Sequence, residues 1–240
     1  MVQAKEQSII PIHWAGKNWL LDKRRVIINT EDQLLILSDI HIGYYSSFRA
    51  NGSYLPTYDA ELLQQTIASL LTDYKNYHWI IAGDIKHNHR KILSEDEQRE
   101  LYNILSTITN HSKLTILMGN HDKGLEELLR DLHIDCAIQE SIKLENYTIT
   151  HSLDILDGSI AGNYILGHVH PILSIDSIKS LFIPIFAVSD NILLLPAFNY
   201  VAGGFNIKKL LKTNSMRKEF TIYAIRNKLY SLGSLKEIPE

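Results

Sequence analysis

The chain has 240 residues, 45% hydrophobic and 21% charged, which is the composition of a folded globular protein and excludes a disordered one. Its net charge of −3 excludes a global basic field that would draw it to nucleic acid or anionic lipid. The single cysteine, Cys136, excludes a disulfide framework or a cysteine-based zinc site within one chain, and it fits a reducing compartment.

The first half of the chain alternates short apolar runs with amphipathic stretches. The apolar runs predict buried strands, and apolar side chains at helical spacing predict helices between them. In chain order these are a hairpin at 9–14 and 19–28, strands at 34–38, 79–82 and 114–118, and helices at 59–74, 95–109 and 125–132.

After Ile134 the pattern changes to strands alone, at 142–144, 147–151, 164–166, 180–188, 192–195 and 219–225. We therefore predict an α/β (α+β) fold with a central β-sandwich flanked by helices. No repeat, low-complexity tract or linker interrupts residues 1–240, so one domain is expected. We see no signal peptide, and the most apolar stretch, 181–188, contains Pro184 and is too short to cross a bilayer. A cytoplasmic protein is expected.

Polar residues follow three of the predicted buried strands. Asp39, Asp84 and Asn120 each come just after such a strand. In open α/β sheets, ligands bind in the crevice at the carboxyl ends of the strands. The positions of these side chains therefore indicate a functional site.

Five blocks of metal-type ligands lie at predicted strand ends: Asp39-Ile40-His41, Gly83-Asp84, Gly119-Asn120-His121-Asp122, His151, and Gly167-His168-Val169-His170. Two adjacent metal ions need several nitrogen and oxygen ligands and a bridging carboxylate, and a set rich in histidine suits Mn, Fe, Zn or Co better than Ca or Mg. Each block alone has an ordinary explanation as a helix cap, a turn or a packed histidine. The whole set in this order favours a metal site.

Two details of spacing support a metal site. In Asp39-x-His41 and His168-x-His170 the paired side chains would point to one face of a strand, or a loop just past the strand would aim both inward. The glycines Gly83, Gly119 and Gly167 would keep the backbone bare where it passes close to the ions.

The five blocks resemble those of the calcineurin-like metallophosphoesterase superfamily over about residues 34–171. The resemblance implies a four-layer fold and two divalent metal ions, with manganese favoured. It implies one metal shell of Asp39, His41, Asp84 and His170, and a second of Asp84, Asn120, His151 and His168, bridged by Asp84. It also implies that His121 protonates the leaving oxygen or steadies the transition state, with Asp122 fixing its orientation.

Further segments resemble the DNA ligase-associated metallophosphoesterases and their archaeal relatives: Ser38–Gly43 with Phe48-Arg49, Gly52 and Leu55-Pro56, then Asp84-Ile85-Lys86-His87, His168–Pro171, Leu195–Phe198 and Gly203-Gly204. This likeness implies a phosphodiesterase or nuclease linked to DNA repair. The same resemblance makes Arg49 and His87 candidate substrate-binding residues. The alternative is that each is an ordinary solvent-exposed side chain. The mildly acidic charge and the Ser152-Leu153 context depart from the narrower family and weaken the assignment to nucleic acid.

Two other features allow nucleic-acid contact, although ordinary explanations serve as well. A basic cluster, Lys208, Lys209, Lys212, Arg217 and Lys218, could bind a polynucleotide backbone, and a solvated loop is the preferred interpretation. The aromatic residues Tyr44, Tyr45, Phe48, Tyr54 and Tyr58 could stack on bases, and loop packing explains them equally well.

Three hypotheses follow for function. The first is a metal-dependent phosphodiesterase, with DNA as one candidate substrate. The second is a phosphomonoesterase or nucleotide phosphatase with the same chemistry. The third is a non-catalytic module in which the metal site is a scaffold, and the presence of His121 and Asp122 argues against it. A homodimer is compatible with the sequence.

Overall fold

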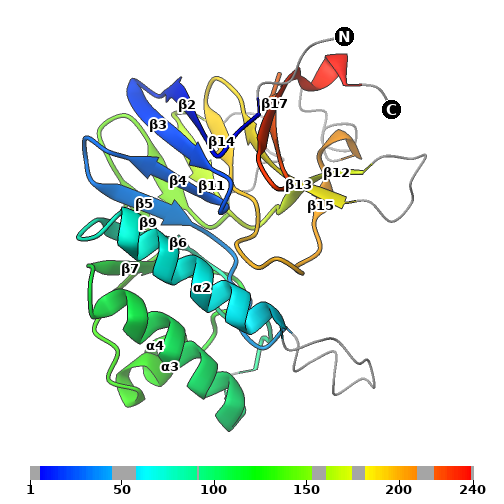
Figure 1. Ribbon diagram of the computed structural model, residues 1–240. Helices are drawn as coiled ribbons and strands as arrows, with labels where there is room; N and C mark the ends of the chain where they lie inside the picture. The colour runs from blue at the N-terminus through cyan, green and yellow to red at the C-terminus, as the bar shows by residue number, and fades with distance from the viewer. Residues whose placement is uncertain are drawn as a thin grey trace.

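Two β-sheets packed face to face form the centre of the protein (Figure 1). The computed structural model describes residues 6–44, 58–90, 92–152, 161–174, 182–209 and 219–238. The first sheet has the strand order β2-β3-β4-β5-β6-β7-β8, antiparallel from β2 to β5 and parallel from β5 to β8. Its strands are β2 (Ile9–Trp14), β3 (Lys17–Asp22), β4 (Val26–Asn29), β5 (Leu34–Leu37), β6 (His78–Ala82), β7 (Leu114–Leu117) and β8 (Ala137–Gln139).

The second sheet has the order β1-β17-β16-β13-β14-β11-β10-β9, and β12 and β15 extend from β13. Its strands β10, β11 and β14 are parallel neighbours. The bounds are β1 (Glu6–Gln7), β9 (Ser141–Lys143), β10 (Thr148–Thr150), β11 (Tyr164–Leu166), β12 (Pro171–Ser174), β13 (Phe182–Val188), β14 (Ile192–Leu194), β15 (Phe205–Asn206), β16 (Thr221–Ile225) and β17 (Leu229–Ser234).

The central strands of the first sheet are apolar throughout because both of their faces are covered. On β6, Trp79 and Ile81 pack toward the helices, whereas Ile80 and Ala82 pack into the layer between the sheets. Successive side chains of a strand point to opposite faces, so a strand in the middle layer needs apolar residues at every position. The same alternation on β5 places Leu35 on the helical side.

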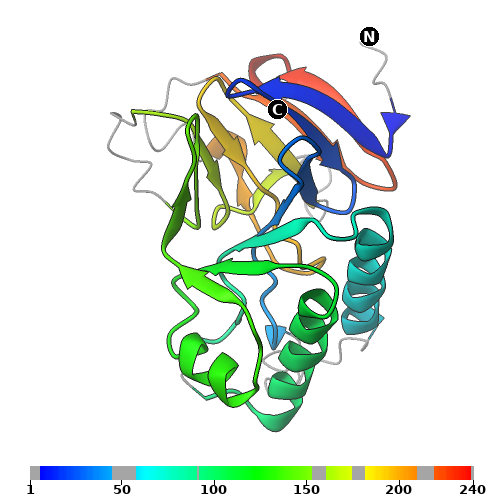
Figure 2. The same cartoon turned by 90° about the vertical axis from the view of Figure 1, so that its left-hand side faces the viewer.

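Within the described residues, three helices lie on the side of the first sheet that faces away from the second sheet (Figures 1 and 2). They are α2 (Tyr58–Asp73), α3 (Glu95–Thr109) and α4 (Leu125–Asp131). A capping box begins α3, in which the Ser94 side chain accepts from the Glu97 amide and Glu97 accepts from the Ser94 amide at 2.8 Å. Outside the second sheet, the described residues include the 3-10 helix η2 (Leu235–Glu237).

This architecture confirms the predicted α/β fold with a central sandwich and flanking helices. The predicted strand at 19–28 is wrong as one element, because a turn with Arg25 at φ 66° divides it into β3 and β4. Strands β1, β8, β12, β15 and β17 were not predicted. In the part of the chain that the structure describes, no helix has the length and apolarity needed to span a bilayer.

Candidate metal centre

The predicted ligand blocks meet at one edge of the sandwich, where parallel strands of both sheets end. Asp39, Asp84 and Asn120 follow β5, β6 and β7 of the first sheet, and His151 and His168 follow β10 and β11 of the second. Hydrogen bonds join the loops across this edge: the Asp39 amide donates to the Gly83 carbonyl at 3.0 Å, and the His168 amide donates to Asp39 Oδ2 at 3.0 Å. The site therefore draws its side chains from both sheets.

Five of these residues have a left-handed backbone. The φ angles are 58° at Asp39, 49° at His41, 51° at Asp84, 63° at His168 and 44° at His170. Residues other than glycine adopt such angles rarely, and they concentrate at functional sites. The Asp-x-His and His-x-His pairs therefore aim inward from loops beyond the strands, the second of the two arrangements expected.

One group of candidate ligands consists of Asp39, His41 and His170, each offering an atom within 4.8 Å of the others. His170 Nε2 lies 3.0 Å from Asp39 Oδ1, and it lies 3.2 Å from His41 Nε2. Asp39 and His41 are 0% and 5% exposed, so these two side chains are shielded from solvent, whereas His170 is partly exposed.

A second group consists of Asp84, His151 and His168, again within 4.8 Å. His151 Nε2 lies 3.4 Å from Asp84 Oδ1, 3.2 Å from His168 Nδ1 and 3.1 Å from Asn120 Oδ1. The other oxygen of Asp84, Oδ2, lies 4.0 Å from His41 Nε2 of the first group. Asp84 thus stands between the two groups, where a bridging carboxylate would have to be.

Backbone carbonyl groups orient three of the imidazoles. The Nδ1 atoms of His151, His170 and His41 face carbonyl oxygens of Ala82 at 2.9 Å, Gly203 at 2.9 Å and Lys86 at 3.4 Å. An Nδ1–H that donates to a carbonyl leaves Nε2 with a lone pair, which is how metal-binding histidines are usually held. Lone pairs that converge beside two carboxylates form a donor set that fits divalent cations of the Mn, Fe, Zn or Co type.

The electrostatics of the site also favour positive charge. Burial opposes ionisation of Asp84, but the hydrogen bond and charge of His151 lower its pKa to about 2. Burial likewise opposes protonation of His151, yet Asp84 and Asp39 raise its pKa to about 9. Burial, with a contribution from His170, lowers the pKa of His41 to about 4. The two buried carboxylates thus attract positive charge, and the pKa values of the imidazoles beside them shift in opposite directions.

His121 lies beside the two groups, as the sequence predicted, with His87 and His89 around it. Its Nε2 is 3.8 Å from Asp84 Oδ2, and its Nδ1 is 2.5 Å from the His87 carbonyl oxygen. The ring of His89 stacks on it with centroids 3.8 Å apart, and the His87 ring lies 5.7 Å from that of His41. His87 is therefore near the site, and the position of His89 had no sequence signal beyond its closeness to His87.

Among the described contacts, Asp122 makes no direct hydrogen bond to His121, the residue it was expected to orient. Its carboxylate accepts from the backbone amides of Lys86 at 3.1 Å and Gly119 at 2.9 Å. Lys86 is itself fully buried, and its Nζ donates to the carbonyls of Arg90 at 2.7 Å and Lys123 at 2.6 Å. Asp122 and Lys86 together fix the two loops that carry the histidines, so the orientation of His121 depends on them indirectly.

The glycines of the blocks have a more specific purpose than expected. A Cβ atom at Gly83 would overlap the His151 ring, and one at Gly119 would overlap Asp84. The bare backbone thus makes room for the candidate ligand side chains themselves. Asn199 was missed entirely: its side chain donates to the Ile40 carbonyl at 2.8 Å and helps to hold the first loop.

Several residues predicted to contact the substrate lie outside the described part of the chain. Arg49, Tyr45, Phe48, Tyr54, Lys212, Arg217 and Lys218 lie outside the described residues, as does the side chain of Tyr58. Of the aromatic set, Tyr44 packs its ring 4.6 Å from that of His87. Of the basic cluster, Lys208 donates from Nζ to the Ile238 carbonyl at 2.9 Å.

A β-sandwich that gathers such a donor set at the carboxyl ends of its parallel strands has the architecture of a metal-dependent hydrolase. The sequence profile of the calcineurin-like phosphoesterase family matches residues 33–214, so the chain belongs to this family. The protein is therefore a phosphoesterase of the metal-dependent class, as its motifs predicted. No curated protein sequence matches the chain significantly.

The chain resembles the crystal structure of the nuclease MPE of Pseudomonas putida, with a TM-score of 0.71 and 21% sequence identity over 92% of this chain and 99% of that one. At this identity the likeness establishes the fold alone. A protein of unknown function from Aquifex aeolicus is 16% identical over 61% of this chain and 82% of that one, with a TM-score of 0.37.

Proposed function

We propose that the protein is a phosphodiesterase that works with two divalent metal ions and acts on DNA or a nucleotide. One ion would be held by Asp39, His41, Asp84 and His170, and the other by Asp84, Asn120, His151 and His168. The placement of Asp84 between the two groups carries the proposal, because one buried carboxylate then serves both. Manganese is the favoured ion for this mixture of imidazole, carboxylate and amide donors.

Divalent ions in these positions would neutralise charge on the phosphoryl oxygens and make a water molecule more acidic. The protein groups supply the rest. Asp39 and Asp84 hold a fixed negative charge in a buried edge, and the carbonyls behind the imidazoles keep the rings from turning. Such pre-organised groups need little rearrangement when charge develops in the transition state.

His121 is the group best placed to handle the leaving oxygen. With Nδ1–H donating to the His87 carbonyl, its Nε2 edge faces Asp84 and the site. When a water oxygen bonds to phosphorus and the bond from phosphorus to the leaving oxygen breaks, a proton on Nε2 can pass to that oxygen. The partly exposed ring can regain the proton from solvent, because its side chain is 21% accessible.

Three findings support DNA or a nucleotide as the substrate. The family is one of phosphoesterases, the fold is shared with a nuclease, and motifs resemble the DNA ligase-associated branch. We also propose a single domain over residues 1–240, a cytoplasmic location, and a role linked to DNA repair.

A substrate panel tests the proposal. Purified protein with Mn²⁺ should hydrolyse bis-p-nitrophenyl phosphate faster than p-nitrophenyl phosphate, and it should cleave a single-stranded oligonucleotide. Asp84→Asn should abolish turnover and reduce bound manganese, measured by elemental analysis. His121→Gln should reduce turnover roughly 100-fold or more and keep the metal, because it removes only a proton donor.

Asp190→Asn is the matched control, since this exposed carboxylate lies in the turn between β13 and β14, at the opposite end of β14 from the candidate metal centre, and it should leave activity unchanged. If the protein hydrolysed p-nitrophenyl phosphate faster than the diester, it would be a phosphatase and not a phosphodiesterase. Full activity in Asp84→Asn would overturn the metal arrangement. Bound metal without turnover on any phosphoester would indicate a scaffold.

A further inference from the structure

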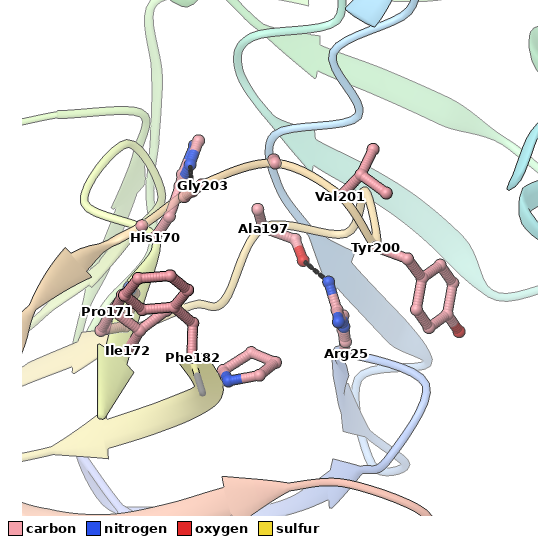
Figure 3. A pocket seen from close by; sticks show the side chains of 12 residues that line it. Arg25, His170, Pro171, Ile172, Phe182, Ala197, Tyr200, Val201 and Gly203 are labelled. Carbon is pink, nitrogen blue, oxygen red and sulfur yellow. Dashed lines mark hydrogen bonds between the residues drawn. The ribbon is translucent and has the colours of Figure 1, made fainter. Parts of the chain in front are cut away.

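A pocket of about 340 Å³ opens beside the candidate metal centre, on the side of His170 (Figure 3). His170 and Gly203 both line it, and His170 Nδ1 lies 2.9 Å from the Gly203 carbonyl oxygen. The volume is at the lower end of the range for small-molecule sites. The candidate metal centre and the pocket therefore share a wall, so a substrate could occupy both.

Arg25 brings a buried positive charge to this pocket. Its residue is 8% exposed, and its Nη1 donates to the carbonyls of Ala197 at 3.0 Å and Asn199 at 2.7 Å (Figure 3 draws the first of these bonds). Its Nε atom is buried and has no hydrogen-bond partner among the described residues. Within the same part of the chain, no carboxylate lies close enough to Arg25 to form an ion pair.

A buried cation without a counter-charge is costly, so the arrangement calls for an explanation. The carbonyls explain how Arg25 is held, but they carry no full negative charge. The ring of Tyr200 also holds the guanidinium, which lies 4.4 Å from the ring centroid, while the Tyr200 hydroxyl is anchored 3.2 Å from the Thr66 hydroxyl. Arg25 is thus fixed in place and retains the capacity to attract an anion.

The opposite wall of the pocket is apolar and partly exposed to solvent. Phe182 begins β13 and is 61% exposed, and Pro184 lies two residues further along the same face. Ile172 of β12 pairs with Pro184 and continues the surface. A phenylalanine exposed in this way beside a proline offers a flat apolar platform on which an aromatic ring can stack.

We propose that this pocket binds the nucleotide next to the scissile phosphodiester, with its base against Phe182 and its phosphate attracted by Arg25. The inference rests on the proposed function and names the part of the substrate that the enzyme recognises. A small inorganic anion would leave the apolar wall unused, and a neutral apolar ligand would leave Arg25 without a counter-charge. A nucleotide can place its base on the apolar wall and its phosphate near Arg25, and its sugar connects it to the reacting phosphate.

Two diesters with the same leaving group test the inference. Thymidine 5′-(p-nitrophenyl phosphate) carries a base, whereas methyl p-nitrophenyl phosphate does not. Phe182→Ala should lower kcat/KM for the thymidine ester by roughly 5- to 150-fold, the range for loss of base stacking, and should change the methyl ester by less than about twofold. Phe205→Ala is the matched control, because Phe205 is also 61% exposed but does not line the pocket.

A binding measurement without metal complements the kinetics. Saturation-transfer NMR on protein treated with chelator should show contact with the base protons of thymidine 5′-monophosphate, weaker contact with thymidine, and loss of both in Phe182→Ala. Equal binding of thymidine and its monophosphate would overturn the role of Arg25. Equal effects of Phe182→Ala on both esters, or none on either, would overturn the pocket, whereas failure of the wild-type protein on both esters would overturn the proposed function.

Discussion

Gly83 is the position where one added methyl group would disturb the candidate metal centre most directly. Its backbone is left-handed, with φ 86°, and a Cβ atom there would overlap the ring of His151. Gly83→Ala therefore has two effects, a strained backbone and a displaced ring. Gly83 is not itself a candidate ligand, but the displaced ring belongs to His151, which is one.

The two effects can be estimated separately. A left-handed backbone costs a residue with a Cβ roughly 1–2 kcal/mol. Displacing the ring breaks the 2.9 Å contact between His151 Nδ1 and the Ala82 carbonyl, a loss of about 0.5–1.5 kcal/mol. We expect Gly83→Ala to lower the free energy of unfolding by about 2–3 kcal/mol. Because this contact orients the ring, affinity for Mn²⁺ should fall roughly 10- to 100-fold.

Urea denaturation followed by circular dichroism measures the first effect, and titration with Mn²⁺ measures the second. Gly203→Ala is the control, since a Cβ at Gly203 would meet no atom within 4 Å. It should change stability by less than about 0.5 kcal/mol. If Gly83→Ala behaved like Gly203→Ala in both measurements, the steric argument would be refuted.

Four further predictions concern stability and the surroundings of the centre. Lys86→Met should lower the free energy of unfolding, measured by urea denaturation, by about 2–4 kcal/mol, because the carbonyls of Arg90 and Lys123 lose the charged donor that this buried side chain supplies. The exposed Lys236→Met should cost under about 0.5 kcal/mol. His89→Ala should lower kcat roughly tenfold with metal content unchanged, because its ring supports His121; an unaltered kcat would refute this. Burial and the charge of Lys113 lower the pKa of His78 below its ordinary 6.5. The neutral His78 side chain therefore stabilises the fold above pH 6.5, and this contribution is lost as the pH falls. The difference in urea midpoint between the wild type and His78→Gln should change on going from pH 8 to pH 5.5. Removing metal with EDTA should lower the melting temperature of the wild type and leave that of Asp84→Asn unchanged, since a ligand stabilises only the state that binds it.

Much of the fold could be predicted because its layers impose local patterns on the sequence. The helix predicted at 95–109 is α3, with the same bounds, since its apolar face and its cap are both local features. The turn between β3 and β4 could not be predicted. Residues 23–25 read Lys-Arg-Arg, without the glycine, proline or asparagine that usually marks a turn, and contacts from distant loops hold Arg25 in place.

The candidate site likewise has a part that the sequence predicts and a part that it does not. Its carboxylates and histidines could be found from the sequence because they recur at the ends of recognisable strands. Their supports could not, because these are side chains that reach distant backbone: Lys86 reaches the carbonyl of Lys123, and Asn199 reaches that of Ile40. A carboxylate such as Asp122 looks like a partner of its neighbour in sequence, although its hydrogen bonds go elsewhere.

The left-handed residues link the stability of the fold to its chemistry. Asp39, His41, Asp84, His168 and His170 each hold a backbone angle that costs of order 1–3 kcal/mol. Such strain persists only where the surroundings enforce it, and here the loops follow largely buried strands and are tied across the two sheets. The strain turns the carboxylates and imidazoles toward one another, although they would otherwise separate or take up water. A divalent cation would gain from this arrangement without having to organise it, so loosening any one loop should weaken metal binding before it unfolds the sandwich.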